Sequence, residues 1–269
     1  MGRSLSLALA ACLALLASCK PGSKEVILAT TTSTQDTGLL DVLVPMFEKQ
    51  SGYALKTISV GSGQAMAMGR RGEADVLLVH SPDDEEAFMK EGFGSRRLAV
   101  MHNDFVIVCP PAASLRGAAS AVEAFKAIAA KQILFVSRSD DSGTHVREKK
   151  IWKQASIEPA GDWYVETGLG MGRTLSVASE KEGCTLSDRG TFLALGKGLD
   201  LEIAVKGDPT LLNAYHVIEV DGGKFPDVNH RGARAFADFL VSAGTQQAIG
   251  SFGVDRFGEP LFVPDAPGK

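Results

Sequence analysis

The stretch Ser137-Arg138-Ser139-Asp140-Asp141-Ser142-Gly143-Thr144-His145 decides the fold, because its neighbours make it the turn between a strand and a helix. The preceding run, 132–136, is short, apolar and rich in β-branched residues, which predicts a strand. From Thr144 onward the spacing of the apolar residues predicts a helix. A strand, a turn and a helix in this order form the repeating unit of α/β proteins.

The same turn combines a permanent cation with small hydrogen-bonding groups. Arg138 supplies a guanidinium fork, Ser142 and Thr144 supply hydroxyls, and the first amides of the helix are unpaired at the positive end of its dipole. Together these groups suit one small oxyanion. The alternative is that Ser142 only caps the helix and that Arg138 pairs with Asp140 or Asp141 at the surface.

Strands alternate with helices on both sides of this turn. Strands are predicted at 26–30, 55–60, 76–79 and 105–108, with amphipathic helices between them. After Pro110-Pro111 the alternation restarts, with helices at 118–130, 144–155 and 174–181 and strands at 133–136 and near Tyr164. A strand at 215–220 and one long helix at 233–249 follow. We therefore predict an α/β protein of two units, each a mostly parallel sheet flanked by helices: lobe I at 25–106 plus 214–269, and lobe II at 107–213.

The first residues have the pattern of an export signal. Arg3 precedes an apolar run at 5–16 that is too short to span a bilayer as a mature helix. Leu16-Ala17-Ser18-Cys19 resembles the lipobox of bacterial lipoproteins, in which the cysteine is acylated. We expect a signal peptide at 1–18, and a lipidated Cys19 with a linker at 19–24. The protein is then anchored on the periplasmic or extracellular face of the membrane; a plain secretory signal with an accidental cysteine is the alternative.

Composition argues against a nucleic-acid partner and a metal site. The formal net charge is -4 and the charged residues are interspersed, so an anion must be attracted by a local site. None of the five histidines stands at metal-ligand spacing with another histidine or a cysteine, and we expect no metal and no cofactor. Cys109 and Cys184 remain after the signal and the lipidated residue are removed, and whether they pair is open.

Three further turns follow predicted strands and precede predicted helices. They are the hydroxyl-rich loop 31–37, the small-residue turn Gly61-Ser62-Gly63-Gln64, and the glycine-rich segment 168–174. Each alone is explained by helix capping or by a tight turn. Ligands of open α/β sheets bind at the carboxyl ends of the strands, however, and a tetrahedral anion needs donors from several directions. Four such turns therefore favour one shared anion site.

Several motifs together resemble the tungstate-binding proteins of bacterial tungstate ABC transporters. The motifs are Thr30-Thr31-Thr32-Ser33-Thr34-Gln35-Asp36-Thr37-Gly38-Leu39-Leu40, Asp75-Val76-Leu77-Leu78-Val79-His80, Asn103-Asp104-Phe105-Val106-Ile107-Val108, 138–145, Gly170-Met171-Gly172 and Leu186-Ser187-Asp188-Arg189-Gly190-Thr191. The resemblance covers nearly the whole mature chain and implies a two-lobe type II periplasmic binding protein that closes on an oxyanion. It implies the following ligand-binding residues: Thr32, Ser33, Ser62, Gly63, Arg138, Ser142, Gly143, Thr144, Met171 and Gly172.

The resemblance predicts a solute-binding lipoprotein and not an enzyme. As a monomer, it captures tungstate and delivers it to an inner-membrane permease. Binding proteins for molybdate, sulfate or phosphate are the nearest alternatives, and residue chemistry alone does not separate tungstate from molybdate. Asp140 and Asp141 are expected to orient Arg138 or to face solvent, outside the anion shell. A serine hydrolase using Ser142 and His145 is the alternative from another class.

Overall fold

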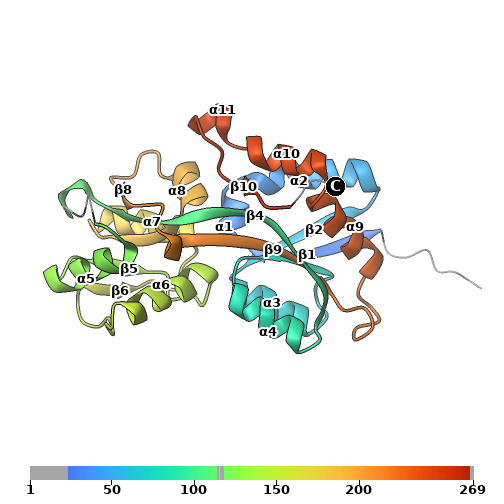
Figure 1. Cartoon of the computed structure of the whole chain (residues 1–269), viewed down its shortest axis with the longest axis horizontal. Helices are drawn as coiled ribbons and strands as arrows, with labels where there is room; N and C mark the ends of the chain where they lie inside the picture. Colours follow the sequence, from blue (N-terminus) through green and yellow to red (C-terminus); the bar gives the residue numbers. More distant parts are fainter. Residues whose placement is uncertain (1–23, 114, 116–117, 267–269) are drawn as a thin grey trace, which may run out of the picture.

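The computed structural model describes residues 24–113, 115 and 118–266. Figure 1 shows two α/β bodies that are joined by the long strands β4 (Gly94–Cys109) and β9 (Leu212–Val220). We keep the names lobe I, for the body that contains β1 to β3, and lobe II, for the body that contains β5 to β8. The predicted signal peptide and Cys19 lie outside the described residues.

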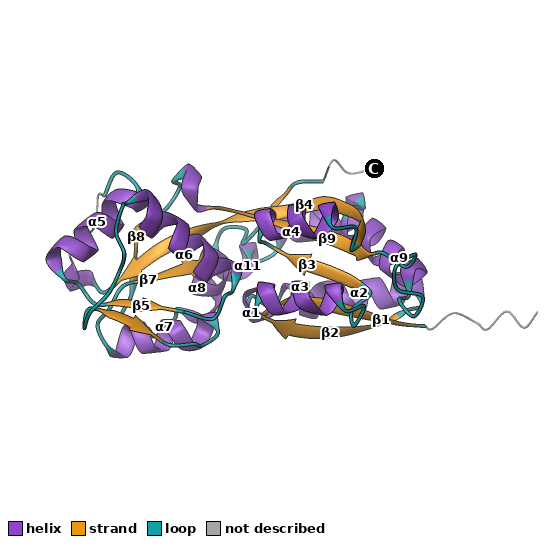
Figure 2. Cartoon of the chain, turned by 90° about the horizontal axis from the view of Figure 1, so that it is seen from below, coloured by secondary structure: helices purple, strands orange, loops and turns teal. Residues whose placement is uncertain are grey.

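The sheet of lobe I is built around β1 (Glu25–Thr31), which pairs in parallel with β2 (Ala54–Val60) and β3 (Val76–Val79). The full strand order is β10-β4-β9-β3-β1-β2, where β9 is antiparallel to β3 and β10 is Val263–Pro264. Helices cover both faces of this sheet (Figure 2). They are α2 (Leu39–Ser51), α3 (Ser62–Arg70), α4 (Pro82–Lys90), α9 (His230–Leu240), α10 (Ala243–Ser251) and the short α11 (Val254–Phe257).

The two crossing strands position the lobes. The first part of β4 pairs with β9, and its last residues pair on either side with β7 (Thr185–Asp188) and β8 (Glu202–Val205). Strand β4 is therefore much longer than the predicted strand 105–108. The segment 94–104 was missed because its charged and half-buried residues do not form the short apolar run on which the prediction relied.

Lobe II contains the parallel pair β5 (Phe135–Ser137) and β6 (Tyr164–Glu166). Around it lie α5 (Ala121–Lys131), α6 (Gly143–Gln154), α7 (Met171–Glu180) and α8 (Arg189–Leu195), with single turns at Pro111–Ala113 and Pro209–Leu211. Aromatic rings of Phe125, Phe135 and Trp152 fill its core. A disulfide joins Cys109 at the end of β4 to Cys184, which precedes β7.

The α/β class is confirmed, and two helix predictions are corrected. The predicted helix 233–249 is two helices, because Ser242 has extended backbone and Gln246 Nε2 donates to the carbonyl of Leu240 across the break, at 2.7 Å. Helix α7 begins at Met171 instead of Thr174, since Gly170 is its N-cap. That earlier start brings the first amides of α7 into the glycine-rich segment. The predicted lobe boundaries stay a prediction.

Candidate functional site

Arg138 directly follows β5 and is buried, with 2 % of its surface exposed. Asp140 holds the guanidinium through one carboxylate oxygen, which accepts from Nη2 at 2.5 Å and from Nε at 3.1 Å. The pairing that we considered as an alternative therefore exists, but inside the protein. The other candidate partner, Asp141, has a side chain that is 83 % exposed and pairs with Lys149 at 3.1 Å.

The guanidinium also contacts both lobes. Nη1 donates to Thr144 Oγ1 at 3.3 Å, within the same turn, and Nη2 lies 3.5 Å from Thr32 Oγ1. Thr32 is the first residue of α1 (Thr32–Asp36), which follows β1 of lobe I. Arg138 thus links a turn of lobe II to the hydroxyl-rich loop of lobe I.

The backbone of the Arg138 turn is unusual for residues other than glycine. Ser139 has φ 45° and Asp141 has φ 52°, both in the sparsely populated left-handed region. The amide of Ser142 donates to Asp140 at 3.2 Å, and the Ser142 hydroxyl accepts from the His145 amide at 3.3 Å as the N-cap of α6. Local hydrogen bonds therefore hold the turn in the shape that places Arg138 inside.

The small-residue turn of lobe I packs against this turn. Ser62, the first residue of α3, accepts a hydrogen bond from the Gly143 amide at 3.2 Å. A Cβ atom added to Gly63 would lie 3.3 Å from the carbonyl oxygen of Asp141. Glycine at position 63 therefore permits the backbones of the two turns to approach each other closely.

The glycine-rich segment is the fourth turn at this place. A Cβ atom added to Gly170 would lie 3.7 Å from Thr32 Oγ1, and one added to Gly172 would lie 3.7 Å from Asp36 Oδ2. The Met171 side chain is fully buried in the core of lobe II, so position 171 has only its backbone amide to offer a ligand. Burial raises the pKa of Asp36, while the amide of Gly172 and the charge of Arg138 lower it.

Ser33 is placed beside a residue that was not predicted as part of the site. Its hydroxyl lies 3.2 Å from Nε2 of the buried His80 and 3.1 Å from Thr31 Oγ1. His80 follows β3 directly, so its position at a carboxyl strand end was the available signal. Asp36 was likewise missed, because a lone acid near a helix gives no pattern in the sequence.

The arrangement suits a small anion. Three helices of at least nine residues begin here, at Ser62, Gly143 and Met171, and their first amides carry partial positive charge. The buried Arg138 adds a fixed cation, and the hydroxyls of Thr32 and Thr144 lie within its reach. The predicted residues Thr32, Ser62, Gly63, Arg138, Ser142, Gly143 and Thr144 are therefore brought together, with Ser33 and Gly172 adjacent.

The arrangement required of a serine hydrolase is absent from the described part of the site. Nδ1 of His145 accepts from the Asp141 amide at 3.1 Å, and Ser142 Oγ accepts from the backbone amide of His145. No hydrogen bond joins the Ser142 hydroxyl to the imidazole of His145 among the described residues, so no nucleophile and base pair is formed. Within these residues there is also no cluster of three or more histidine, cysteine or acidic side chains placed to hold a metal ion.

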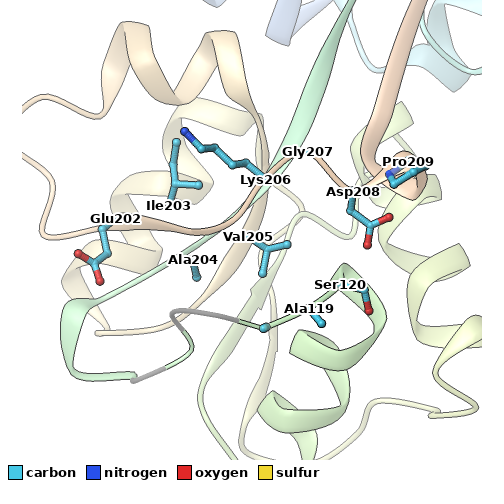
Figure 3. Close-up of a pocket in the computed structure, with 11 residues that line it drawn as sticks. Ala119, Ser120, Glu202, Ile203, Ala204, Val205, Lys206, Gly207, Asp208 and Pro209 are labelled. Atoms are coloured by element: carbon cyan, nitrogen blue, oxygen red, sulfur yellow. The ribbon is translucent and has the colours of Figure 1, made fainter.

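One large hollow of the molecule lies next to the candidate site, and another lies elsewhere in lobe II. A groove of about 580 Å³ between the lobes is lined by Thr32, Asp36, Gly170, Gly172 and Arg173, together with Ser176, Leu195 and Leu199. A hollow of about 610 Å³ lies elsewhere in lobe II, between residues 118–120 and 202–209. Figure 3 shows that its lining includes the charged Glu202, Lys206 and Asp208, but none of the predicted ligand residues. The groove adjoins the candidate site, as does a smaller hollow of about 20 Å³ whose lining includes His80 and Gly143.

Comparisons with known proteins find a matching family and similar structures. Residues 19–243 match the family described as "PBP superfamily domain". The chain is 46 % identical over 246 residues to the "Tungstate-binding protein TupA" of Peptoclostridium acidaminophilum, covering 90 % of this chain and 86 % of that protein. Two solved structures are similar. The tungstate ABC transporter protein of Geobacter sulfurreducens is 42 % identical with a TM-score of 0.78, covering 85 % of this chain and 98 % of that one. TupA of Desulfovibrio alaskensis G20 is 44 % identical with a TM-score of 0.75, covering 90 % and 99 %.

Proposed function

The chain belongs to the PBP superfamily and, within it, to the family of the tungstate-binding proteins TupA, and from this premise we propose that it captures tungstate and delivers it to an ABC permease. Its two-lobe α/β architecture is that of the type II periplasmic binding proteins, a family of solute-binding proteins and not of enzymes. The predicted family is confirmed. The ligand-binding residues stay a prediction.

The observation that carries this proposal is the position of Arg138. The guanidinium is buried at a point where turns of both lobes meet, within hydrogen-bonding distance of Thr32 and Thr144. An oxyanion bound there accepts charge-assisted hydrogen bonds, each of which contributes about 1.5 to 3 kcal/mol. A site of this kind supplies the donors that a buried dianion requires.

The protonation state of the ligand favours tungstate over phosphate at this site. Tungstate is a dianion without a proton near neutral pH, whereas phosphate retains a proton that a carboxylate would have to accept. In the Arg138 turn the Asp140 carboxylate is occupied by the guanidinium and by the Ser142 amide, and Asp141 faces solvent. Hydrogen-bond donors therefore predominate in this turn. Molybdate has the same charge and shape, and it is the closest competitor.

Transport follows from contacts to both lobes. An anion that contacts Thr32 and Ser62 of lobe I and Arg138 of lobe II binds the closed form better than any open form, and so shifts the population toward closure. The permease then recognises the closed protein. This activity places the protein outside the cytoplasm, and we propose that Cys19 anchors it by a lipid and that it acts as a monomer. No described helix is both long and apolar enough to cross a membrane.

Thermal shifts of the mature protein test the function. In an amine buffer, tungstate is expected to raise the melting temperature more than sulfate or phosphate, because a ligand at a thousandfold excess over its Kd stabilises the folded state by about 4 kcal/mol. Molybdate is included in the same panel. Arg138→Ala is expected to abolish the tungstate shift by removing the buried cation.

Arg71→Ala is the matched control, because Arg71 is exposed and pairs only locally with Glu73. It is expected to leave the tungstate shift unchanged. A panel without any shift would contradict anion transport, and a larger shift with phosphate or sulfate would reassign the ligand. Turnover of an ester that depends on Ser142 would support the hydrolase.

A further inference from the structure

His80 contacts the candidate site from lobe I. It follows β3, is 4 % exposed, and its Nε2 lies 3.2 Å from the Ser33 hydroxyl on α1. Its ring packs against the ring of Tyr215 on β9, with 4.7 Å between ring centres. One imidazole therefore contacts a predicted ligand turn and one of the two strands that cross between the lobes.

The same imidazole also meets lobe II. A Cβ atom added to Gly143 would lie 2.9 Å from His80 Nδ1 and 3.0 Å from the His80 carbonyl oxygen, so only glycine fits against this ring. Gly143 is the first residue of α6 and its amide donates to Ser62. The end of the Arg138 turn thus packs against the His80 ring where the two lobes meet.

We propose that His80 is a positioning residue for anion capture, which donates from Nε2 to Ser33 and so directs the Ser33 hydroxyl proton outward as a hydrogen-bond donor. This inference rests on the proposed function. A hydroxyl has one proton and two acceptor lone pairs. When His80 occupies a lone pair of Ser33, the hydroxyl proton is free for the anion or for Thr31 Oγ1, which lies 3.1 Å away.

The surroundings of the second ring nitrogen support this tautomer. Nδ1 is buried without a hydrogen-bond partner in the described structure. A proton on Nδ1 instead would need the side chain of Asn213 as its acceptor, and it would leave Nε2 with no proton to donate to Ser33. The neutral ring with its proton on Nε2 is therefore the form that suits the closed arrangement.

The charges around His80 fix the expected pH dependence. Burial lowers the pKa of His80, and Arg138 also lowers it, whereas the carboxylates of Asp188 and Glu85 and a hydrogen bond with the Asn213 side chain raise it. Opening the lobes removes Gly143 from the ring, so the open form binds a proton more easily. Protonation then favours the open form, and tungstate affinity is expected to fall as pH decreases.

Calorimetric titration of the mature protein with micromolar tungstate tests this role. His80→Phe keeps a ring but loses the donor, and it is expected to weaken binding about tenfold at pH 8, the effect of one hydrogen bond. His80→Gln restores a donor at a similar reach and is expected to recover most of the affinity. Ser33→Ala combined with His80→Phe is expected to bind no more weakly than either single variant, because both remove the same interaction.

The pH profile separates positioning from a purely structural role. Between pH 8 and pH 6 the affinity of the wild type is expected to fall, while that of His80→Gln stays nearly constant with the same ligand. Additive losses in the double variant, or equal pH profiles, would overturn the role of His80. If His80→Phe does not fold, judged by circular dichroism, His80→Gln and Ser33→Ala still decide the question. A wild type that does not bind tungstate at pH 8 would instead contradict the proposed function.

Discussion

Glu148 supports the Arg138 turn from beneath. Its buried carboxylate accepts hydrogen bonds from Ser137 at 2.9 Å, from Tyr164 at 2.8 Å and from Trp152 at 3.2 Å. The Ser137 hydroxyl in turn accepts from the Ser139 amide at 3.2 Å. The position of Ser137, the residue before Arg138, is therefore fixed by Glu148, which is not itself one of the candidate ligand residues.

Glu148 gives the protein a pH-dependent stability. Burial raises its pKa from 4.5 to about 7, although the three hydrogen bonds oppose the rise. A pKa that is higher in the folded state means that the stabilising contribution is fully present below about pH 4.5 and is lost as pH rises through 7. The shift amounts to about 3 kcal/mol. Glu148→Gln, which stays neutral, is expected to flatten this part of the profile in urea unfolding between pH 4.5 and 8.

A control for Glu148→Gln is the exposed Glu123→Gln, which removes an acid on α5 whose pairing with Lys126 is local. It is expected to leave the profile as in the wild type. Equal pH dependence of the wild type and Glu148→Gln would show that the carboxylate is ionised in the folded protein at all these pH values.

Single residues also show how much of the candidate site could be predicted from the sequence. Arg138 was predicted because a permanent cation beside small donors, on a turn between a strand and a helix, is recognisable along the chain. Its partner was not decided, since Asp140 and Asp141 are equivalent in sequence and only the left-handed backbone at Ser139 and Asp141 separates them. His80 is far from the turn in sequence, and its position directly after β3 was the signal that could have indicated it. Glu148 lies on α6, and no local pattern marks it.

At the scale of elements, the start of α6 is the most constrained point. Alanine normally stabilises a helix relative to glycine by about 1 kcal/mol. At position 143 an added methyl group would contact the His80 ring and its carbonyl oxygen, and a backbone atom does not move aside easily. Gly143→Ala is therefore expected to oppose closure and to weaken tungstate binding about tenfold or more, the effect of a typical overpacked contact.

Gly244→Ala on α10 is the matched control, since an added Cβ there meets nothing within 4 Å. Calorimetric titration is expected to show unchanged affinity for this variant, and thermal unfolding an equal or slightly higher stability. Unchanged affinity of Gly143→Ala would mean that the two lobes do not approach at this point when the anion is bound.

Helices and strands that contain apolar runs could be predicted from the sequence. Those whose bounds depend on contacts with other parts of the fold could not. The strands β1 and β3 follow from buried apolar runs, and β2 follows from a mainly half-buried run in which apolar residues recur. The first half of β4 depends on its pairing with β9, and the break between α9 and α10 depends on Gln246, which also donates to the carbonyl of Val100 in another element. Tertiary contacts of this kind leave no local period in the sequence.

At the scale of the whole molecule, the two lobes are stabilised by different features. Lobe I has its central sheet, whereas lobe II also has the disulfide between Cys109 and Cys184, which are 75 residues apart. The sequence left this pairing open because spacing alone does not report proximity. Strand β4 carries Cys109 into lobe II, where it is bonded to Cys184, and Cys184 pairs with Phe135 of β5, the strand that ends next to Arg138.

Reduction of this disulfide is expected to destabilise lobe II without removing the site. Closing a loop of this length stabilises the folded state by up to about 4 kcal/mol on chain-entropy grounds. Both cysteines are buried in the core that contains Phe135 and are not part of the Arg138 turn, so the folded protein should keep its affinity for tungstate. Urea unfolding with and without dithiothreitol measures the first effect, and calorimetric titration of the reduced protein below the unfolding range measures the second. A reduced protein that stays folded but binds at least tenfold more weakly would show that the disulfide positions the Arg138 turn, because the core and the site would then be mechanically coupled.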